Sequence, residues 1–278
     1  MNNNTLTYQP HVLVLSIVQN HQDYIDHFFQ LLDNTHYSNN RISIALLVSD
    51  SSDQSLEKLY TAIHQFQNRW RQTQTFYKID VYEKNFQLDS RPDTMEDPLN
   101  SKRAYLARAK NFLLTASLRE YHEWVSWIDI ELYDYPRTIF GDLIKFDMDV
   151  IVPNCLLKRE DDNEFWGYDR DNWQESDLSL ERQYNLPEHE VLMEDYNKYA
   201  IGRHLLINMP TNTGKEDIVP LDGVGGTFIF VKSTVHREGA IFPPFIYQHH
   251  LDTEGFAKMV KSMGFSVYGI PSYIIYHF

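Results

Sequence analysis

The sequence predicts an α/β fold with a mostly parallel sheet, and two features of the chain support this prediction. Continuous apolar runs of strand length occur at Val12 to Val18 (VLVLSIV) and Ile42 to Val48 (ISIALLV). Such runs are typical of strands that are buried on both faces. A helical stretch follows each run, and this strand–helix order is typical of βαβ units in a parallel sheet.

The other elements of the first half follow in order. We predict helices over residues 21–32, 54–70 and 102–118 with a short one from 136, and further strands over residues 76–82, 124–130 and 149–152. Asp53 is placed to cap the helix over 54–70. The polar, proline-containing stretch over residues 88–100 predicts a loop.

The second half is less regular. Residues 158–220 are charged and aromatic without clear periodicity, which in a compact domain is typical of a functional or mobile segment. After it we predict a strand over 226–232, a helix over 253–263 and short strands over 266–268 and 273–276. We therefore expect one domain, residues 8–278, with a large inserted region that faces the substrate.

The composition limits the ligands, the cross-links and the membrane segments that we expect for this chain. In the 278 residues, 25 Lys and Arg face 39 Asp and Glu, which gives a net charge of −14. This charge disfavours nucleic acid, although a local basic pocket or a divalent cation would still admit a small anion. The single Cys155 forms no intrachain disulfide, and we expect it to be buried and structural. Without a signal peptide or a run of about 18 apolar residues, we expect a soluble chain of undetermined compartment.

Two acids follow the apolar strand in the segment WVSWIDIE, residues 124–131. The carboxyl end of a parallel strand opens toward the ligand crevice of such sheets, and Asp129 and Glu131 are one residue apart there. Two carboxylates suit manganese or magnesium, with diphosphate oxygens and water as further ligands. On spacing alone, a strand that ends in solvated acids explains the pattern equally well.

The helix after residue 100 is unusually basic for so acidic a chain. Arg103 and Lys110 are seven residues apart and share a face, and Arg108 neighbours Asn111. A local basic face can receive a diphosphate that the remaining surface repels. A solvated helix face with ordinary ion pairs is the alternative.

Two further segments combine acids with glycine or histidine. LDGVGGT, residues 221–227, has three glycines in four positions, which permits close approach to a ligand or a tight turn before the next strand. HHLDTEG, residues 249–255, contains two histidines and two acids, and Thr253 is a plausible helix N-cap. Ordinary capping also explains the second segment.

Eight motifs in order give the chain a resemblance to a known family. They are ARAKNFLL (107–114), WIDIE (127–131), DVIVPNC (149–155), YDRDNWQE (168–175), LDGVGG (221–226), HREGA (236–240), TEGFAKM (253–259) and YGIP (268–271). Together they resemble the fungal mannan polymerase α-mannosyltransferases, glycosyltransferase family 62, from about Val12 to the C-terminus.

The resemblance implies a GT-A fold, with residues of about 10–153 binding the nucleotide sugar and 154–278 binding the acceptor. It implies mannose transfer from GDP-mannose to a mannoside or glycan acceptor, with retention of the α configuration and Mn²⁺ (or Mg²⁺) as cofactor. The D-x-D motif of the family maps to Asp129 and Glu131, and its C-terminal histidine maps to His277. Family members are anchored in the Golgi membrane and assemble into complexes, so a protein partner is expected.

The resemblance also implies roles around the donor and the acceptor. Ser16, Asp50, Arg103, Arg108 and Asp129 are expected to bind the donor. Asp222 and Glu254 are expected to hold sugar hydroxyls or to stabilise the developing cation, as the catalytic pair. The aromatic residues expected to contact acceptor sugars are Tyr168, Trp173 and Trp166, with core packing as their alternative. A non-catalytic sugar-binding or scaffold subunit, or a transferase that uses another nucleotide sugar, remains the alternative function.

Overall fold

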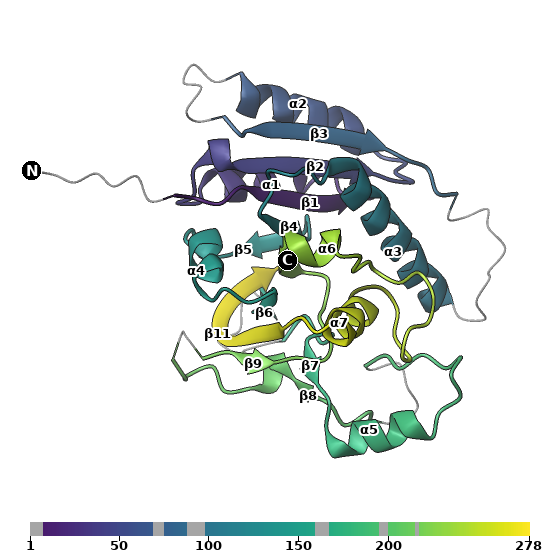
Figure 1. Cartoon of the computed structure of the whole chain (residues 1–278). Helices are drawn as coiled ribbons and strands as arrows, with labels where there is room; N and C mark the ends of the chain where they lie inside the picture. The colour runs from purple at the N-terminus through teal and green to yellow at the C-terminus, as the bar shows by residue number, and fades with distance from the viewer. Residues whose placement is uncertain (1–7, 69–74, 88–97, 159–166, 195–199, 215–216) are drawn as a thin grey trace, which may run out of the picture.

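A nine-stranded sheet lies at the centre of the fold (Figure 1). In this computed structural model the described residues are 8–68, 75–87, 98–158, 167–194, 200–214 and 217–278. The order across the sheet is β3-β2-β1-β4-β10-β6-β11-β5, and β9 pairs with β11 beside that path. The strands are β1 Val12–Val18, β2 Ile42–Val48, β3 Lys78–Glu83, β4 Trp124–Ile128, β5 Leu132–Asp134, β6 Val150–Leu157, β9 Val219–Pro220, β10 Phe228–Lys232 and β11 Val267–His277.

The directions of these strands confirm the prediction of a mostly parallel α/β sheet. Strands β1 to β4 run parallel to one another, and β6 runs parallel to β11. Strand β10 lies antiparallel between β4 and β6. The short strands β5 and β9 pair antiparallel with β11. The antiparallel strand β10 joins the two parallel groups into one sheet.

Helices cover both faces of the sheet. Successive residues of a strand point to opposite faces, so alternate residues of one strand pack against different helices. On one face, Val12 and Val14 pack with α1 Ile25–Asp33, α2 Ser55–Gln67 and α4 Ile139–Lys145. On the other face, Leu13 and Leu15 pack with α3 Pro98–Ser117, α6 Ser233–Arg237 and α7 Asp252–Ser262. The continuous apolar runs of β1 and β2 are explained by this burial on both sides.

A smaller unit lies at the lower end of the molecule in Figure 1, beside α7. It contains the two-stranded sheet of β7 Trp173–Gln174 and β8 His204–Leu205, with α5 Asp177–Tyr184. This unit belongs to the stretch in which the sequence shows no clear periodicity, because its elements are too short to produce one. A short 3-10 helix, Leu206–Asn208, follows β8, and another, Asn39–Arg41, precedes β2 in the main sheet.

The structure corrects several predicted element boundaries. Asp53 does not cap α2 from the N-cap position, which is Gln54, although its carboxylate accepts the amide of Ser55. Thr253 lies inside the first turn of α7, which begins one residue earlier. The two short strands predicted near the C-terminus form one strand, β11, whose register with β6 shifts between Ile270 and Ile274. Strand β5 was not predicted.

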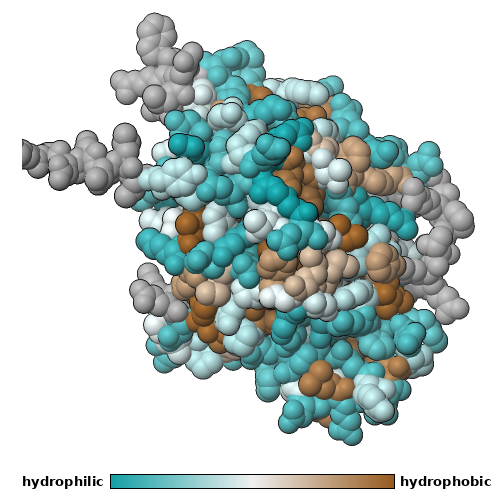
Figure 2. Space-filling view, viewed as in Figure 1, coloured by the Kyte–Doolittle hydropathy of each residue, from teal (hydrophilic) through white to brown (hydrophobic). Residues whose placement is uncertain are grey.

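The surface agrees with the acidic composition. The face shown in Figure 2 is mostly hydrophilic, and its hydrophobic residues occur in small separate groups. Cys155 is fully buried, as predicted. Among the residues that the structure describes, no helix is both long enough and apolar enough to cross a membrane.

Candidate active site

A cavity of about 410 Å³ opens at the carboxyl ends of β1 and β4. Its lining comes from these strand ends, from α3 and from the start of α7. The lining residues are Leu15, Ser16, Ile17, Gln19, His21, Lys102, Arg103, Leu106, Lys110, Trp127, Ile128, Asp129, Glu131, Asp171, Gly226, Asp252 and Thr253. Ligands of open α/β sheets bind at this edge, so the cavity is the candidate active site.

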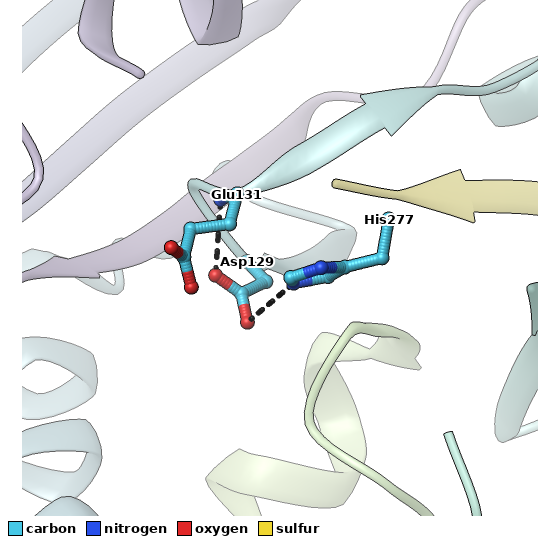
Figure 3. Close-up of side chains that lie close together, drawn as sticks. All are labelled: Asp129, Glu131 and His277. Carbon is cyan, nitrogen blue, oxygen red and sulfur yellow. Dashed lines mark hydrogen bonds and ion pairs between the residues drawn. The ribbon is translucent and has the colours of Figure 1, made fainter. Parts of the chain in front are cut away.

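Three potential metal ligands meet at the edge of this cavity (Figure 3). One ligand atom each from Asp129, Glu131 and His277 lies within 4.8 Å of the others. The amide of Glu131 donates to Asp129 Oδ1 at 3.1 Å, which fixes the turn that brings both acids to one side. The pairing of His277 with Leu132 in β5 holds the histidine beside this turn.

The environment of His277 fits a metal ligand. Its side chain is only 4% exposed, and Nδ1 bonds the carbonyl oxygen of Phe278 at 3.0 Å. Within the described part of the chain, Nε2 is buried without a hydrogen-bond partner and lies 3.6 Å from Asp129 Oδ2. A metal ion would satisfy this nitrogen, and a backbone bond on the other ring nitrogen is the usual arrangement for a ligating histidine. Two carboxylates and an imidazole suit Mn²⁺.

Charges around the cluster keep Asp129 ionised. Burial raises the pKa of Asp129, but His277 and the amide of Glu131 outweigh that effect, so the net pKa lies below its ordinary value. His21 Nε2 lies 3.8 Å from Glu131 Oε2 on the cavity wall. An ionised carboxylate is the form that binds a divalent cation.

The cavity wall formed by α3 carries three cations, Lys102, Arg103 and Lys110, and the last two are paired with acids. Arg103 donates to Glu254 through Nη1 and to Asp171 Oδ2 through Nη2 at 2.8 Å. Lys110 Nζ lies 2.5 Å from Asp252 Oδ2. Arg103 and Lys110 line the same cavity, as the seven-residue spacing predicted for one helix face.

Glu254 lies behind this wall rather than on it. Its side chain is fully buried, and its carboxylate accepts bonds from Arg103, from Trp173 Nε1 at 2.8 Å and from Arg203 Nη1 at 3.3 Å. Burial raises the pKa of Glu254 to about 7, although Arg103 and Arg203 act in the opposite direction. Glu254 therefore orients Arg103, and it is not among the residues that line the cavity.

The remaining predicted donor and catalytic residues lie at varying distances from the site. Ser16 lines the cavity, and its buried Oγ has no hydrogen-bond partner within the described residues. Asp50 accepts the amides of Phe86 and Gln87, both at 3.0 Å, and is not a lining residue. Arg108 is half-buried on α3 and is also absent from the lining. Their roles in donor binding stay predictions.

Asp222, the other predicted catalytic acid, pairs with a lysine outside the cavity. Its carboxylate accepts from Lys261 and from the amide of Glu175, the latter at 2.8 Å. Burial raises the pKa of Asp222, but the bond from Lys261 and the neighbouring positive charges lower it below its ordinary value. The structure does not bring Asp222 together with the metal-ligand cluster in one lining, so its catalytic role also stays a prediction.

The two described aromatic candidates differ in exposure. Tyr168 is 39% exposed and stacks on His277, so it lies next to the site. Trp173 is fully buried, and the Arg203 guanidinium carbon lies 3.7 Å from its ring centroid. The structure therefore shows the core-packing alternative for Trp173, and we do not propose it as a sugar platform. Trp166 lies outside the described residues.

The glycine-rich segment before β10 packs against buried side chains. A Cβ on Gly223 would lie 2.2 Å from Trp173 Cε2, and one on Gly225 would lie 1.8 Å from Asp169 Oδ1. The buried Asp169 carboxylate accepts from Thr227 Oγ1 at 2.6 Å, and the Thr227 carbonyl accepts the Asp129 amide at 2.9 Å. The glycines thus permit close packing that positions Asp129.

Sequence reasoning missed two acids of the cavity, Asp171 and Asp252. Asp171 lies in the motif YDRDNWQE, and Asp252 lies two residues before Glu254, to which we assigned the catalytic role. A helix that begins at Asp252 turns that residue and Glu254 in different directions. The missing signal was therefore the true first residue of α7.

Comparison with known proteins identifies the family. The sequence pattern of the Anp1 family matches residues 1–246. The chain belongs to the Anp1 family. It is 37% identical over 276 residues to the mannan polymerase II complex anp1 subunit of Schizosaccharomyces pombe, which covers 96% of this chain and 63% of that protein. It is 35% identical over 265 residues to the corresponding ANP1 subunit of Saccharomyces cerevisiae, covering 92% and 52%.

Solved structures show which fold this Anp1-family chain has. A mannosyltransferase from Pyrobaculum calidifontis, in complex with GDP-Man and Mn²⁺, aligns with a TM-score of 0.55 at 12% identity, covering 98% of this chain and 57% of that one. S. aureus TarS residues 1–349 align with a TM-score of 0.50 at 13% identity, covering 96% and 60%. The fold is the GT-A glycosyltransferase fold, and the predicted family and fold are both confirmed. The chain spans 63% and 52% of the length of the two mannan polymerase relatives.

Proposed function

We propose that this chain is a metal-dependent α-mannosyltransferase that transfers mannose from GDP-mannose to a mannoside or glycan acceptor. One observation carries the proposal: the cluster of Asp129, Glu131 and His277 lies at the edge of a cavity to which α3 contributes Lys102, Arg103 and Lys110. A protein of net charge −14 would otherwise repel a nucleoside diphosphate. The cluster and the wall together make a site for its phosphates.

Each part of the site has a proposed role. Asp129, Glu131 and His277 would hold Mn²⁺, which when bound would supply positive charge to offset the charge of the departing diphosphate. Arg103, held in place by Glu254, donates its N–H groups to phosphate oxygens. Tyr168 contacts the acceptor with the part of its ring that His277 leaves uncovered. Retention of the α configuration is what the family resemblance implies.

The relatives support the choice of sugar and suggest a partner. Two of them are named subunits of mannan polymerase II complexes, and a structural neighbour was solved with GDP-Man and Mn²⁺. We therefore propose GDP-mannose as the donor, and we propose that the chain works beside another subunit. A scaffold subunit without activity would share the fold but would have no need for a complete set of metal ligands.

Transfer of labelled mannose from GDP-mannose to α-mannobiose tests the proposal, with Mn²⁺ binding measured by calorimetry. We expect Asp129→Ala to abolish Mn²⁺ binding and to lower transfer by about 100-fold or more, since several kcal/mol of charge stabilisation are lost. Asp147→Ala is the matched control, because Asp147 is an exposed aspartate that pairs with Lys232. Undiminished transfer by Asp129→Ala contradicts the metal role. A wild-type chain that binds neither GDP nor Mn²⁺ supports the scaffold alternative.

A further inference from the structure

We propose that Asp252 binds a sugar hydroxyl in the active site through its free carboxylate oxygen; this inference rests on the proposed function. Asp252 lines the cavity, yet its side chain is only 7% exposed. Its two oxygens differ in their surroundings. Oδ2 lies 2.5 Å from Lys110 Nζ, whereas Oδ1 is buried without a hydrogen-bond partner among the described residues.

A buried carboxylate oxygen without a donor is costly, because it has lost its water and gained nothing in exchange. The ion pair with Lys110 holds the side chain in one orientation. A donor group that enters the cavity and reaches Oδ1 would recover the lost interaction. The free oxygen is therefore arranged to accept a hydrogen bond from a ligand.

The backbone at Asp252 fixes where its side chain starts. Its φ is 49°, in the left-handed region, which aspartate and asparagine adopt more often than other residues with a Cβ. Gln248 and His249 share this conformation, with φ of 48° and 67°. The Asp252 amide donates to the carbonyl of Pro243 at 3.0 Å, which holds the turn in place. The turn therefore helps to hold the Asp252 carboxylate at the cavity.

The chemistry of the wall selects the ligand group. A carboxylate oxygen accepts hydrogen bonds and repels anions, so it cannot bind the diphosphate. Asp252 also neutralises Lys110, so this end of the wall suits an uncharged group that carries hydroxyls. The hydroxyls of a hexose have this chemistry, and they come from either the donor mannose or the acceptor.

Two substitutions separate the carboxylate from the backbone. Asp252→Gly removes both oxygens and relaxes the φ strain, whereas Asp252→Asn keeps an accepting oxygen in a residue that tolerates this φ. Asp147 offers a matched control, since it has φ of 52° and pairs with Lys232 at 2.8 Å, but its side chain is 82% exposed. Asp147→Gly should behave as the wild type in every assay below, and circular dichroism verifies that each variant is folded.

The measurements are the Kd of GDP, the Kd of GDP-mannose and the KM of α-mannobiose, all with Mn²⁺ present. We expect Asp252→Gly to leave GDP binding unchanged or tighter, and to weaken one sugar-dependent constant by about 10-fold, the usual loss for a hydrogen bond to a charged group. Asp252→Asn should recover part of that loss. If the Kd of GDP-mannose changes relative to the Kd of GDP, the bound hydroxyl belongs to the donor mannose. If only the KM of α-mannobiose changes, the hydroxyl belongs to the acceptor.

Two results would overturn the inference while leaving the proposed function intact. One is an Asp252→Gly variant that matches the wild type in both sugar-dependent constants while Asp129→Ala loses transfer. The other is equal weakening of GDP and GDP-mannose, which would place the effect on the phosphates. A wild-type chain that binds neither GDP-mannose nor mannobiose would overturn the proposed function and this inference together.

Discussion

The imidazole of His277 stacks on the ring of Tyr168, with centroids 3.9 Å apart and planes inclined by 13°. Tyr168 thus fixes the plane of a proposed metal ligand from a segment that joins β6 at the bridge between Leu156 and Gly167, and its own amide donates to the carbonyl of Cys155 at 3.0 Å. Groups that orient a metal ligand contribute to metal affinity although they do not touch the ion. The stacked pair connects the metal cluster to the part of the chain that we expect to meet the acceptor.

Replacement of Tyr168 tests this connection. We expect Tyr168→Ala to weaken Mn²⁺ binding by about 10-fold, because His277 loses the ring that holds its orientation. Tyr168→Phe keeps the stacked ring and should bind Mn²⁺ as the wild type does. Calorimetric titration with Mn²⁺ measures both variants, and equal affinities for Ala and Phe would show that the stacking does not support the site.

Glu254 should contribute strongly to stability. We expect Glu254→Ala to lower the free energy of unfolding by about 3 kcal/mol. The substitution removes the buried carboxylate that pairs with Arg103 and Arg203, and it leaves a cavity beside Trp173. Glu254→Gln keeps the volume and one accepting oxygen and should lose less. Urea denaturation measures the change, with Glu238→Ala on the exposed surface as the control, expected within about 0.5 kcal/mol of the wild type.

Two adjacent glycines should respond differently to the same substitution. Gly225→Ala places a methyl group against the Asp169 carboxylate and should cost about 2 kcal/mol of stability. A Cβ on Gly226 meets no atom within 4 Å, so Gly226→Ala should leave the unfolding free energy within about 0.5 kcal/mol of the wild type. Thermal and urea unfolding check both. Equal losses would mean that the Asp169 carboxylate yields to the methyl group.

Asp169 gives a pH dependence of known sign. Burial, followed by the charge of Asp171, raises the pKa of Asp169 to about 6, while bonds from Thr227 lower it. A folded-state pKa above the ordinary 3.8 means that this carboxyl favours folding when protonated, so its contribution falls as the pH rises from about 4 to about 6. Relative to Asp169→Asn, the wild type should lose about 2 kcal/mol of stability between pH 4 and pH 7.

Urea denaturation across that pH range measures the unfolding free energy of the wild type and of Asp169→Asn. Subtracting one from the other removes the effect of the titrating groups that both proteins share. A difference that stays constant with pH would contradict the raised pKa. A difference that grows with pH would mean that Asp169 is stabilised in its charged form.

Local patterns predicted the features that depend on neighbours in the sequence. The buried runs of β1 and β2, the acids after β4 and the shared face of Arg103 and Lys110 were all found where expected. Each follows from strand or helix periodicity within one element. His277 was placed beside Asp129 only through the family resemblance, because no periodicity connects β4 with β11.

The features that were missed depend on tertiary packing. Trp173 has the composition of a sugar platform, but Gly223 lets the backbone close over its ring and Arg203 packs on it. Glu254 and Asp252 are two residues apart, so a shift of one residue in the start of α7 decides which acid faces the cavity. Whether such a side chain faces the cavity or the core depends on how distant segments pack together, and local sequence patterns do not reveal that packing.

The antiparallel strand β10 has a consequence for the order of folding. It inserts between β4 and β6, and the residue that precedes it, Thr227, accepts the amide of Asp129. The strands β1 to β4 all lie within residues 12–128, so they are synthesised before β10, and one edge of β4 stays open until β10 pairs with it. We therefore expect folding during synthesis to pass through a species that has an unpaired central edge and no capacity to bind Mn²⁺, and that is prone to aggregate until β10 docks.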